Sequence, residues 1–177
     1  MSKSTQISTH PDLFVVETGL GEYSASLKAL KTFEAGSTLA SIDGVTNTHK
    51  AYTSVQFGSA PGQHISLNSD LVYANHSCEP SVYFDLSSPD RSRWHVRAAR
   101  RIEKGEYITF FYPSTEWDME QPFECRCGAK SCLRYIRGAK YLTWGELKAR
   151  GFIAPWIRQC VRQRDAENSQ ELAAVKL

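Results

Sequence analysis

Cysteines are the residues of this chain whose type and spacing point most directly to chemistry. Three of the five, Cys125, Cys127 and Cys132, lie within eight positions in the segment PFECRCGAKSC. Zinc prefers tetrahedral sites built from thiolates, and short spacings let one loop supply several ligands. Gly128 follows the second cysteine and allows the chain to curl back around an ion. The spacing therefore predicts a metal site, whose fourth ligand comes from Cys78, Cys160 or a histidine.

A second group of polar residues follows an apolar run in the segment LVYANHSCEPSVYF, residues 71–84. Asn75, His76, Ser77 and Cys78 stand side by side there. An ordinary loop with one buried thiol would have the same composition. The segment therefore becomes a candidate site only in combination with the other motifs of the chain.

Composition limits the class of protein. The chain has 177 residues, 41% hydrophobic and 23% charged, which is typical of a soluble globular domain. It contains no long uncharged apolar run, and its polar N-terminus lacks the apolar stretch of a signal peptide. We therefore expect no membrane association and an intracellular location, cytoplasmic or nuclear. Thiols stay reduced there, which favours a metal over a disulfide framework.

Charge is unevenly distributed along the chain. Residues 1–90 hold 4 Lys/Arg against 9 Asp/Glu, whereas residues 91–164 hold 16 against 7. The basic half lacks the dense Lys/Arg run that marks a nucleic-acid-binding tail, and aromatic residues are not interleaved with it. The pattern therefore argues against a nucleic-acid partner.

Short strands with tight turns dominate the first two thirds of the chain. Alternating or β-branched runs predict strands at 13–18, 52–58, 64–67, 81–86, 94–100 and 107–112. Residues 23–42 read as two short extended pieces around a turn at Ala35–Gly36, although a helix over 26–33 competes. Thr143 and Glu146 form a capping-box pattern, and Pro155 begins a final helix.

Three motifs follow one another in a diagnostic order: NHSCEP at 75–80, KGEYITFFY at 104–112 and FECRCGAKSC at 123–132. Together they resemble the SET domain family with its post-SET zinc loop, a family of S-adenosylmethionine-dependent protein lysine methyltransferases. The resemblance covers roughly residues 13–137. It implies a mostly β fold with appended helices, a β-clip-like arrangement of short strands with a pseudoknot.

The resemblance also implies a domain organisation. Residues 1–12 would be a flexible N-terminus, 13–113 the SET domain, 114–137 the post-SET zinc loop and 138–177 a C-terminal helical extension. The apolar residues of the extension recur at helix-like intervals, so we expect its helices to pack on the SET core or on a second subunit.

The resemblance assigns roles to residues of all three motifs. It implies one structural zinc held by Cys78, Cys125, Cys127 and Cys132, which leaves Cys160 a free helical thiol. Asn75 and His76 would hold the methionine and adenine parts of S-adenosylmethionine. Tyr112 would be the catalytic residue, because a tyrosine hydroxyl can orient a neutral amine without adding a full charge.

The chain departs from the family pattern at several positions. The family carries Gly-x-Gly where its backbone approaches the cofactor, and counting back from FEAG places that site at Ser24, Ala25 and Ser26. An alternative register uses Gly19-Leu20-Gly21. Ser81 replaces a common Asn, and Phe111 replaces an Asp before the catalytic tyrosine. Phe110, lacking a hydroxyl, would favour transfer of more than one methyl group.

The expected function is methyl transfer to a lysine side-chain amine of a protein or peptide, such as a histone or another basic protein. Free lysine has a pKa of about 10.4, so such a site must bind the amine and release its proton. The alternative is a catalytically weak or inactive SET module that binds a protein or small-molecule partner.

Overall fold

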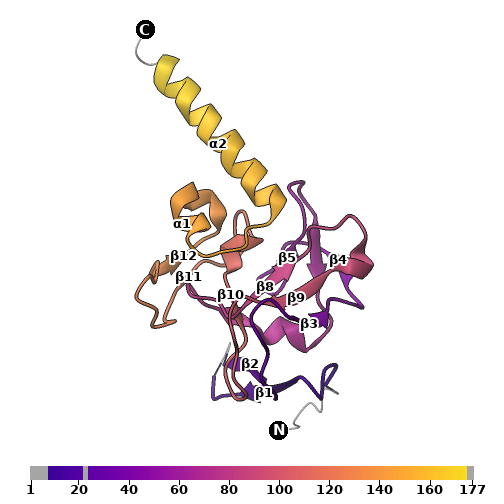
Figure 1. Ribbon diagram of the computed structural model, residues 1–177. Helices are drawn as coiled ribbons and strands as arrows, with labels where there is room; N and C mark the ends of the chain where they lie inside the picture. The colour runs from indigo at the N-terminus through magenta and orange to yellow at the C-terminus, as the bar shows by residue number, and fades with distance from the viewer. Residues whose placement is uncertain (1–7, 22–23, 175–177) are drawn as a thin grey trace.

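A computed structural model describes residues 8–21 and 24–174 of the protein. Short strands make up most of its secondary structure, and two α-helices follow them near the C-terminus (Figure 1). The strands are β1 (Phe14–Thr18), β2 (Ala25–Ala29), β3 (Thr38–Ser41), β4 (Thr46–Thr48), β5 (Val55–Gln56), β6 (His64–Ser66), β7 (Asn75–His76), β8 (Val82–Asp85), β9 (His95–Ala98), β10 (Thr109–Phe110), β11 (Phe123–Glu124) and β12 (Tyr135–Ile136). The helices are α1 (Trp144–Lys148) and α2 (Pro155–Ala174), with 3-10 turns η1 (Asp70–Tyr73), η2 (Arg91–Arg93), η3 (Tyr112–Ser114) and η4 (Ala139–Tyr141).

The strands pair in small sheets. Two antiparallel sheets of three strands have the orders β3-β9-β8 and β4-β6-β5, and β1-β2 and β11-β12 are antiparallel pairs. The predictions of short strands and tight turns are confirmed for this part of the chain. Because each sheet is small, its exposed face must be covered by another sheet, and the cores of the sheets merge into one.

One parallel pair decides where the functional motifs lie. β7 runs parallel to β10, with Asn75 beside Thr109 and His76 beside Phe110. Parallel strands cannot be joined by a hairpin, so this pairing brings together segments far apart in the sequence. It places the NHSC segment directly beside the strand that ends before Tyr112.

The hydrophobic core is continuous from the first hairpin to the base of α2. The largest side chains within it are almost fully buried: Phe14, Leu27, Ile65, Leu71, Phe84, Ile102, Ile108, Phe111 and Leu147. A second, smaller cluster surrounds Cys78 and Cys125 with Ile136. The small cluster has too little apolar area to fold alone, which is consistent with a metal-bound appendage.

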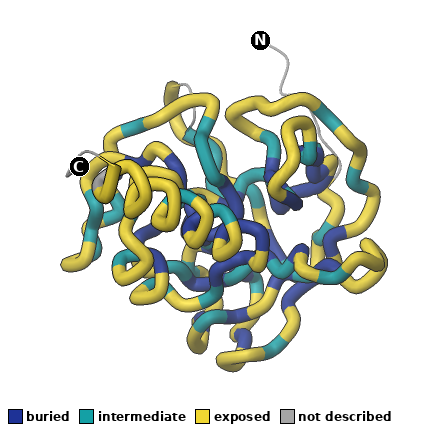
Figure 2. Tube along the Cα trace, turned by 90° about the horizontal axis from the view of Figure 1, so that it is seen from above, coloured by how far each residue is buried: buried dark blue, intermediate teal, exposed yellow. Residues whose placement is uncertain are grey.

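The C-terminal helices pack on the core through their first turns. Thr143 and Glu146 form the predicted capping box at the start of α1. In α2, Trp156, Ile157 and Val161 are buried, and the Trp156 Nε1–H donates to the carbonyl of Thr115 (3.1 Å). Most of the rest of α2 is exposed and projects away from the strands (Figures 1 and 2). Packing on the core is therefore confirmed for the base of the extension.

Some predicted elements differ from the structure. The helix considered for 26–33 is wrong: residues 25–29 form β2, and Phe33 makes an isolated bridge to Ile102. Strand is limited to Val55–Gln56 within 52–58 and to Thr109–Phe110 within 107–112, because η3 begins at Tyr112.

The predicted flexible N-terminus and the other domain boundaries stay predictions. Residues 1–7 lie outside the described residues, while the backbone N–H groups of Thr9 and His10 donate to the carboxylate of Asp70 (2.9 and 3.0 Å). In the part of the chain that the structure describes, neither helix has the length and apolar character needed to cross a bilayer.

Candidate active site and metal centre

The four cysteines predicted as metal ligands lie together. The sulfur atoms of Cys78, Cys125, Cys127 and Cys132 are all within 4.8 Å of one another. Cys78 follows β7, whereas the other three lie after β11, on the loop that leads to β12. Gly128 has a positive φ of 73°, which lets the loop reverse its direction as predicted.

The chemistry of this cluster fits a zinc ion. Burial raises the pKa of both the Cys78 and the Cys125 thiol, so a cation is needed to hold both as thiolates near neutral pH. The backbone N–H groups of Leu133 and Arg134 donate to the sulfurs of Cys78 and Cys132, each at 3.4 Å. Four thiolates closing one site are typical of structural zinc. Zinc binding itself stays a prediction.

A cavity of about 1020 Å³ adjoins the cysteine cluster. Its size is at the upper end of the range for sites that enclose small molecules. The lining includes five of the predicted functional residues and two of the cysteines: Ser24, Ala25, Asn75, His76, Tyr112, Cys125 and Cys127. The cysteine loop therefore forms one wall of this cavity, and a metal that fixes the loop also fixes the wall.

His76 links the cavity to the cysteine cluster. The Tyr112 backbone N–H donates to His76 Nδ1 (3.2 Å), and His76 Nε2 lies 3.5 Å from the sulfur of Cys78. Because Nδ1 accepts a hydrogen bond, the ring proton belongs on Nε2, facing the sulfur. Burial, together with the nearby charge of Arg150, lowers the pKa of His76 to about 3. His76 is therefore a neutral ring that positions both Tyr112 and Cys78.

Asn75 is held on the other side of β7. Its side-chain Nδ2–H donates to the carbonyl of Ala25 in β2 (3.0 Å), which ties the NHSC segment to the first hairpin. Ser24 and Ala25 line the cavity beside it, as do Gly19 and Gly21 of the alternative register.

Residues of both segments considered as the counterpart of Gly-x-Gly, 19–21 and 24–26, thus line the same side of the large cavity. A Cβ on Gly19 would lie only 3.1 Å from the Cβ of Ser24, so the two halves of this turn are closely packed. Ser26, by contrast, pairs with Glu17 in the β1-β2 ladder and is not part of the lining.

Tyr112 also lines the large cavity. Its hydroxyl donates to the carbonyl of Ala74 (3.3 Å), and its ring packs edge-on against His76 with centroids 5.2 Å apart. Burial, with a smaller contribution from the charge of Glu116, raises the pKa of Tyr112 to about 12. The phenol therefore stays neutral and can donate or accept a hydrogen bond, as the predicted role requires.

Behind Tyr112 lies a second, small cavity of about 30 Å³. It shares six of its nine lining residues with the large cavity, including Phe110 and Tyr112, and its lining adds Glu116, which is only 8% exposed. Sequence reasoning missed Glu116. Its only signal was its place four residues after Tyr112, in a segment where charged side chains would ordinarily face solvent.

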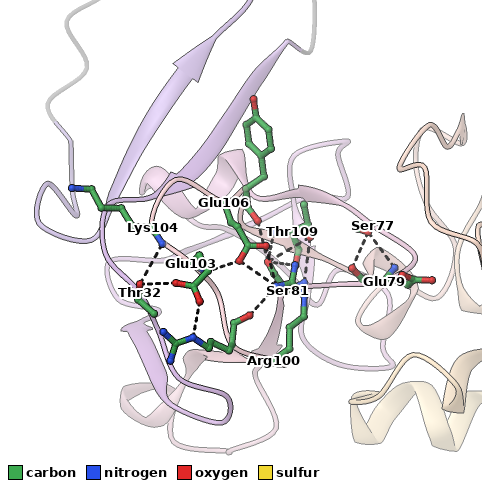
Figure 3. Close-up of polar contacts among 11 residues, drawn as sticks. Thr32, Ser77, Glu79, Ser81, Arg100, Glu103, Lys104, Glu106 and Thr109 are labelled. Atoms are coloured by element: carbon green, nitrogen blue, oxygen red, sulfur yellow. Dashed lines mark hydrogen bonds and ion pairs between the residues drawn. The ribbon is translucent and has the colours of Figure 1, made fainter.

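Ser81, which replaces the common Asn, is fully buried and organises β10. Its backbone N–H donates to the carbonyl of Thr109 (2.9 Å), and the Thr109 N–H donates back to Ser81 Oγ (2.8 Å). The Ser81 hydroxyl also lies 3.2 Å from the carbonyl of Tyr107. Figure 3 shows these contacts together with the Ser77–Glu79 turn of the NHSC segment. The serine therefore keeps the strand before Tyr112 in place.

Comparisons with known proteins define the class. Residues 24–113 match the SET domain family. Methyltransferase flvH from Aspergillus flavus is 45% identical over 135 residues, which cover 75% of this chain and 72% of that protein. The histone-lysine N-methyltransferase, H3 lysine-36 specific, from Candida albicans is 37% identical over 96 residues, which cover 53% of this chain but only 11% of that much longer protein.

Solved structures share the fold. The methyltransferase domain of human histone-lysine N-methyltransferase SETMAR has a TM-score of 0.52 at 17% identity, with 71% of this chain and 58% of that chain covered. KRYPTONITE in complex with mCHG DNA and SAH has a TM-score of 0.51 at 20% identity, with 69% and 29% covered.

The chain belongs to the SET domain family. The predicted fold class, mostly β with appended helices and a cysteine loop, is confirmed. Within this family it shares most of its length with a protein named as a methyltransferase.

Proposed function

We propose that this protein is an S-adenosylmethionine-dependent methyltransferase that acts on an amine, with the lysine side chain of a protein or peptide as the acceptor. One observation carries the proposal: a single cavity gathers Asn75, His76 and Tyr112 from motifs far apart in the sequence, beside the cysteine loop. The name of the relative flvH supports methyl transfer, and the histone-lysine names of more distant relatives support the lysine acceptor.

Each group at the site has a distinct task. When bound, S-adenosylmethionine supplies a methyl group on a sulfonium. Asn75, Ser24 and Ala25 offer amide and backbone groups that bind a polar ligand along the cavity wall. The neutral Tyr112 hydroxyl orients the acceptor nitrogen, and the surrounding aromatic rings exclude water from it. Because Tyr112 is neutral, its hydroxyl can hold the nitrogen without adding a charge of its own.

The metal has a structural task in this proposal. One zinc ion bound by Cys78, Cys125, Cys127 and Cys132 would cross-link the NHSC segment to the cysteine loop. All four ligand positions are taken by protein, so no open position is left for water. The ion would therefore stabilise the cavity wall and take no part in the chemistry.

A protein substrate and an intracellular location also belong to the proposal. KRYPTONITE has been solved with DNA and with an H3(1-15) peptide, and the peptide is the relevant comparison for an acceptor lysine. The uneven charge of this chain does not by itself provide a nucleic-acid site, so we propose a basic protein or peptide as the partner.

Calorimetry and methyl transfer test the proposal together. The purified chain is titrated with S-adenosylmethionine and with its demethylated product, and then assayed with labelled S-adenosylmethionine on an H3 peptide and on a protein extract. We expect both ligands to bind and label to appear on lysine. Binding of both ligands without transfer to any amine would favour the inactive binding module, and absence of binding would contradict the cofactor assignment.

A further inference from the structure

Glu116 is the buried acid that the motifs of the family do not account for. It lies in the segment that follows η3, and its backbone N–H donates to the carbonyl of Tyr112 (3.0 Å). The carbonyl of Glu116 in turn accepts from the N–H of Ala139 (2.8 Å). These two bonds fix its backbone relative to Tyr112, so the position of its side chain is set by the same turn that positions the tyrosine.

The side chain is held by one partner and leaves one oxygen free. The backbone N–H of Gln56 donates to Glu116 Oε1 (2.6 Å), and the Gln56 side chain is itself tied to the N–H of Trp117 (2.8 Å) and the carbonyl of Gly58 (2.6 Å). Among the described residues, no group donates to the second oxygen, Oε2. Glu116 Oε2 is therefore available to accept a hydrogen bond from a small ligand.

The small cavity provides room for such a ligand. Its volume of about 30 Å³ holds a group about the size of one water molecule or an ammonium head. Six of its nine lining residues, Phe110 and Tyr112 among them, also line the large cavity, so a group placed there would lie beside Tyr112 and next to the large cavity. An acceptor nitrogen held there would adjoin the cavity proposed for the methyl donor.

The charges around Glu116 favour a cation. Burial raises the pKa of Glu116 to about 7, while the positive charge of Lys50 acts in the opposite direction. Lys50 is itself paired with Glu120 (3.7 Å), an exposed residue that also lines this cavity. Tyr112 is neutral. The cavity therefore contains a carboxylate that titrates near neutral pH and gains most from a cationic partner.

We propose that the carboxylate of Glu116 binds the acceptor amine of the substrate as an ammonium ion beside Tyr112 and takes its proton before methyl transfer. This inference rests on the proposed function. In the proton step an N–H bond of the ammonium breaks, its electron pair stays on nitrogen, and the proton forms an O–H bond with Glu116. The carboxyl group then returns the proton to solvent on the side of the exposed Glu120.

Binding of a lysine-like amine tests the first half of the proposal without requiring turnover. The probe is n-butylammonium at pH 8, where the amine is still cationic and the carboxylate is mostly ionised. In the presence of the demethylated cofactor product, we expect Glu116→Gln to weaken its affinity by about 10- to 100-fold, as for loss of one charge-assisted hydrogen bond. The neutral probe 1-butanol should bind both proteins equally.

The variants separate charge from shape. Glu116→Gln keeps an oxygen that can accept the hydrogen bond from the Gln56 backbone N–H. Glu116→Asp keeps the charge but shortens the side chain by one methylene, so this variant should retain most of the n-butylammonium affinity. Glu146→Gln is the matched control: it removes a charge at the capping box of α1, where glutamine also serves, far from either cavity. It should bind the probe like the wild type.

The pH dependence of methyl transfer to Nα-acetyl-lysine amide tests the second half. For the wild type, kcat/KM should rise as pH passes about 7, because ionised Glu116 is the proton acceptor. Glu116→Gln should lose this limb and gain rate only toward the pKa of the free amine, near 10. A residue with a purely structural role would lower the rate at every pH alike.

The results distinguish this inference from the proposed function. Equal affinity of wild type and Glu116→Gln for n-butylammonium, or no binding of it by the wild type, would overturn the role of Glu116. Methyl transfer with an unchanged pH profile in Glu116→Gln would overturn the proton step and leave the methyltransferase intact. Glu116-dependent amine binding without any methyl transfer would instead reject the proposed function.

Discussion

Replacing Tyr112 by phenylalanine removes one oxygen from the junction of the two cavities and keeps the ring. The only hydrogen bond from that hydroxyl among the described residues is the 3.3 Å contact with the carbonyl of Ala74. Its loss should cost about 1 kcal/mol or less of folding stability, equivalent to a decrease of about 2–4 °C in Tm for a chain of this size. The rate, by contrast, should fall by about 10²–10⁴-fold, the range for losing one group that orients the reacting atoms.

Single-turnover methyl transfer with saturating labelled S-adenosylmethionine measures the rate of the chemical step, and calorimetry measures cofactor affinity. The rate loss corresponds to about 3–5 kcal/mol of transition-state stabilisation, which exceeds any effect on folding. Cofactor affinity should change by less than about threefold, because Asn75 and the wall at Ser24 remain. Tyr107→Phe is the matched control: its hydroxyl also makes a 3.3 Å hydrogen bond, to Glu17, and lies outside both cavities.

Wild-type transfer by Tyr112→Phe would refute the assignment of Tyr112. Equal losses in Tyr112→Phe and Tyr107→Phe would show that the rate depends on general stability and not on the position of the hydroxyl.

Four further predictions follow from the same geometry. Cys132→Ser should lower the bound zinc from about one per chain toward zero, measured by metal analysis, and weaken cofactor binding while the β core keeps its circular dichroism. Asn75→Ala should weaken cofactor affinity in calorimetry by about tenfold through loss of one polar contact and its bond to β2, with turnover restored at high cofactor concentration. Burial raises the pKa of Glu116 from 4.5 to about 7, so the folded state holds that proton more tightly than the unfolded state. The free energy of unfolding of the wild type should therefore fall by up to about 3 kcal/mol as pH rises from about 4.5 to 7. The Tm of Glu116→Gln relative to wild type should rise across this window, and a constant difference would contradict the buried charge. Deleting residues 142–177 exposes the core that Trp156 and Ile157 cover and should give insoluble protein, whereas a truncated chain with an unchanged Tm would contradict this.

The local parts of the site could be predicted from sequence because their chemistry is local. Cys125, Cys127 and Cys132 are close in the chain, so their spacing alone indicates that they bind one metal ion together. Cys78 could be added only through the resemblance of its motif, since residue spacing left Cys160 and the histidines open. The capping box at Thr143 was likewise predictable, because the pattern and the bond it describes span three residues.

Other parts depended on tertiary packing, which the sequence does not display. Leu27, Leu30 and Phe33 recur at a spacing that suits a helix, yet Leu27 faces the core from a strand and Phe33 from a bridge to Ile102. The pairing of β7 with β10 joins distant segments and has no local signal. Glu116 was missed for the same reason: its contacts with Gln56 and Ala139 join segments that are distant in the sequence.

The unequal spacing of the four cysteines has a consequence for the order in which the molecule matures. In the proposed zinc site, three thiols of one loop could bind a metal locally, whereas Cys78 is brought beside them by the pairing of β7 with β10. Closing that long loop carries an entropic cost that the core strands must first offset. If zinc binds as proposed, the fourth metal–sulfur bond would then form late, after the core strands have assembled. In a zinc-poor cell, newly made chains would accumulate with their strands assembled and the cavity wall open, so metal supply would limit how much of the protein becomes competent to bind its cofactor.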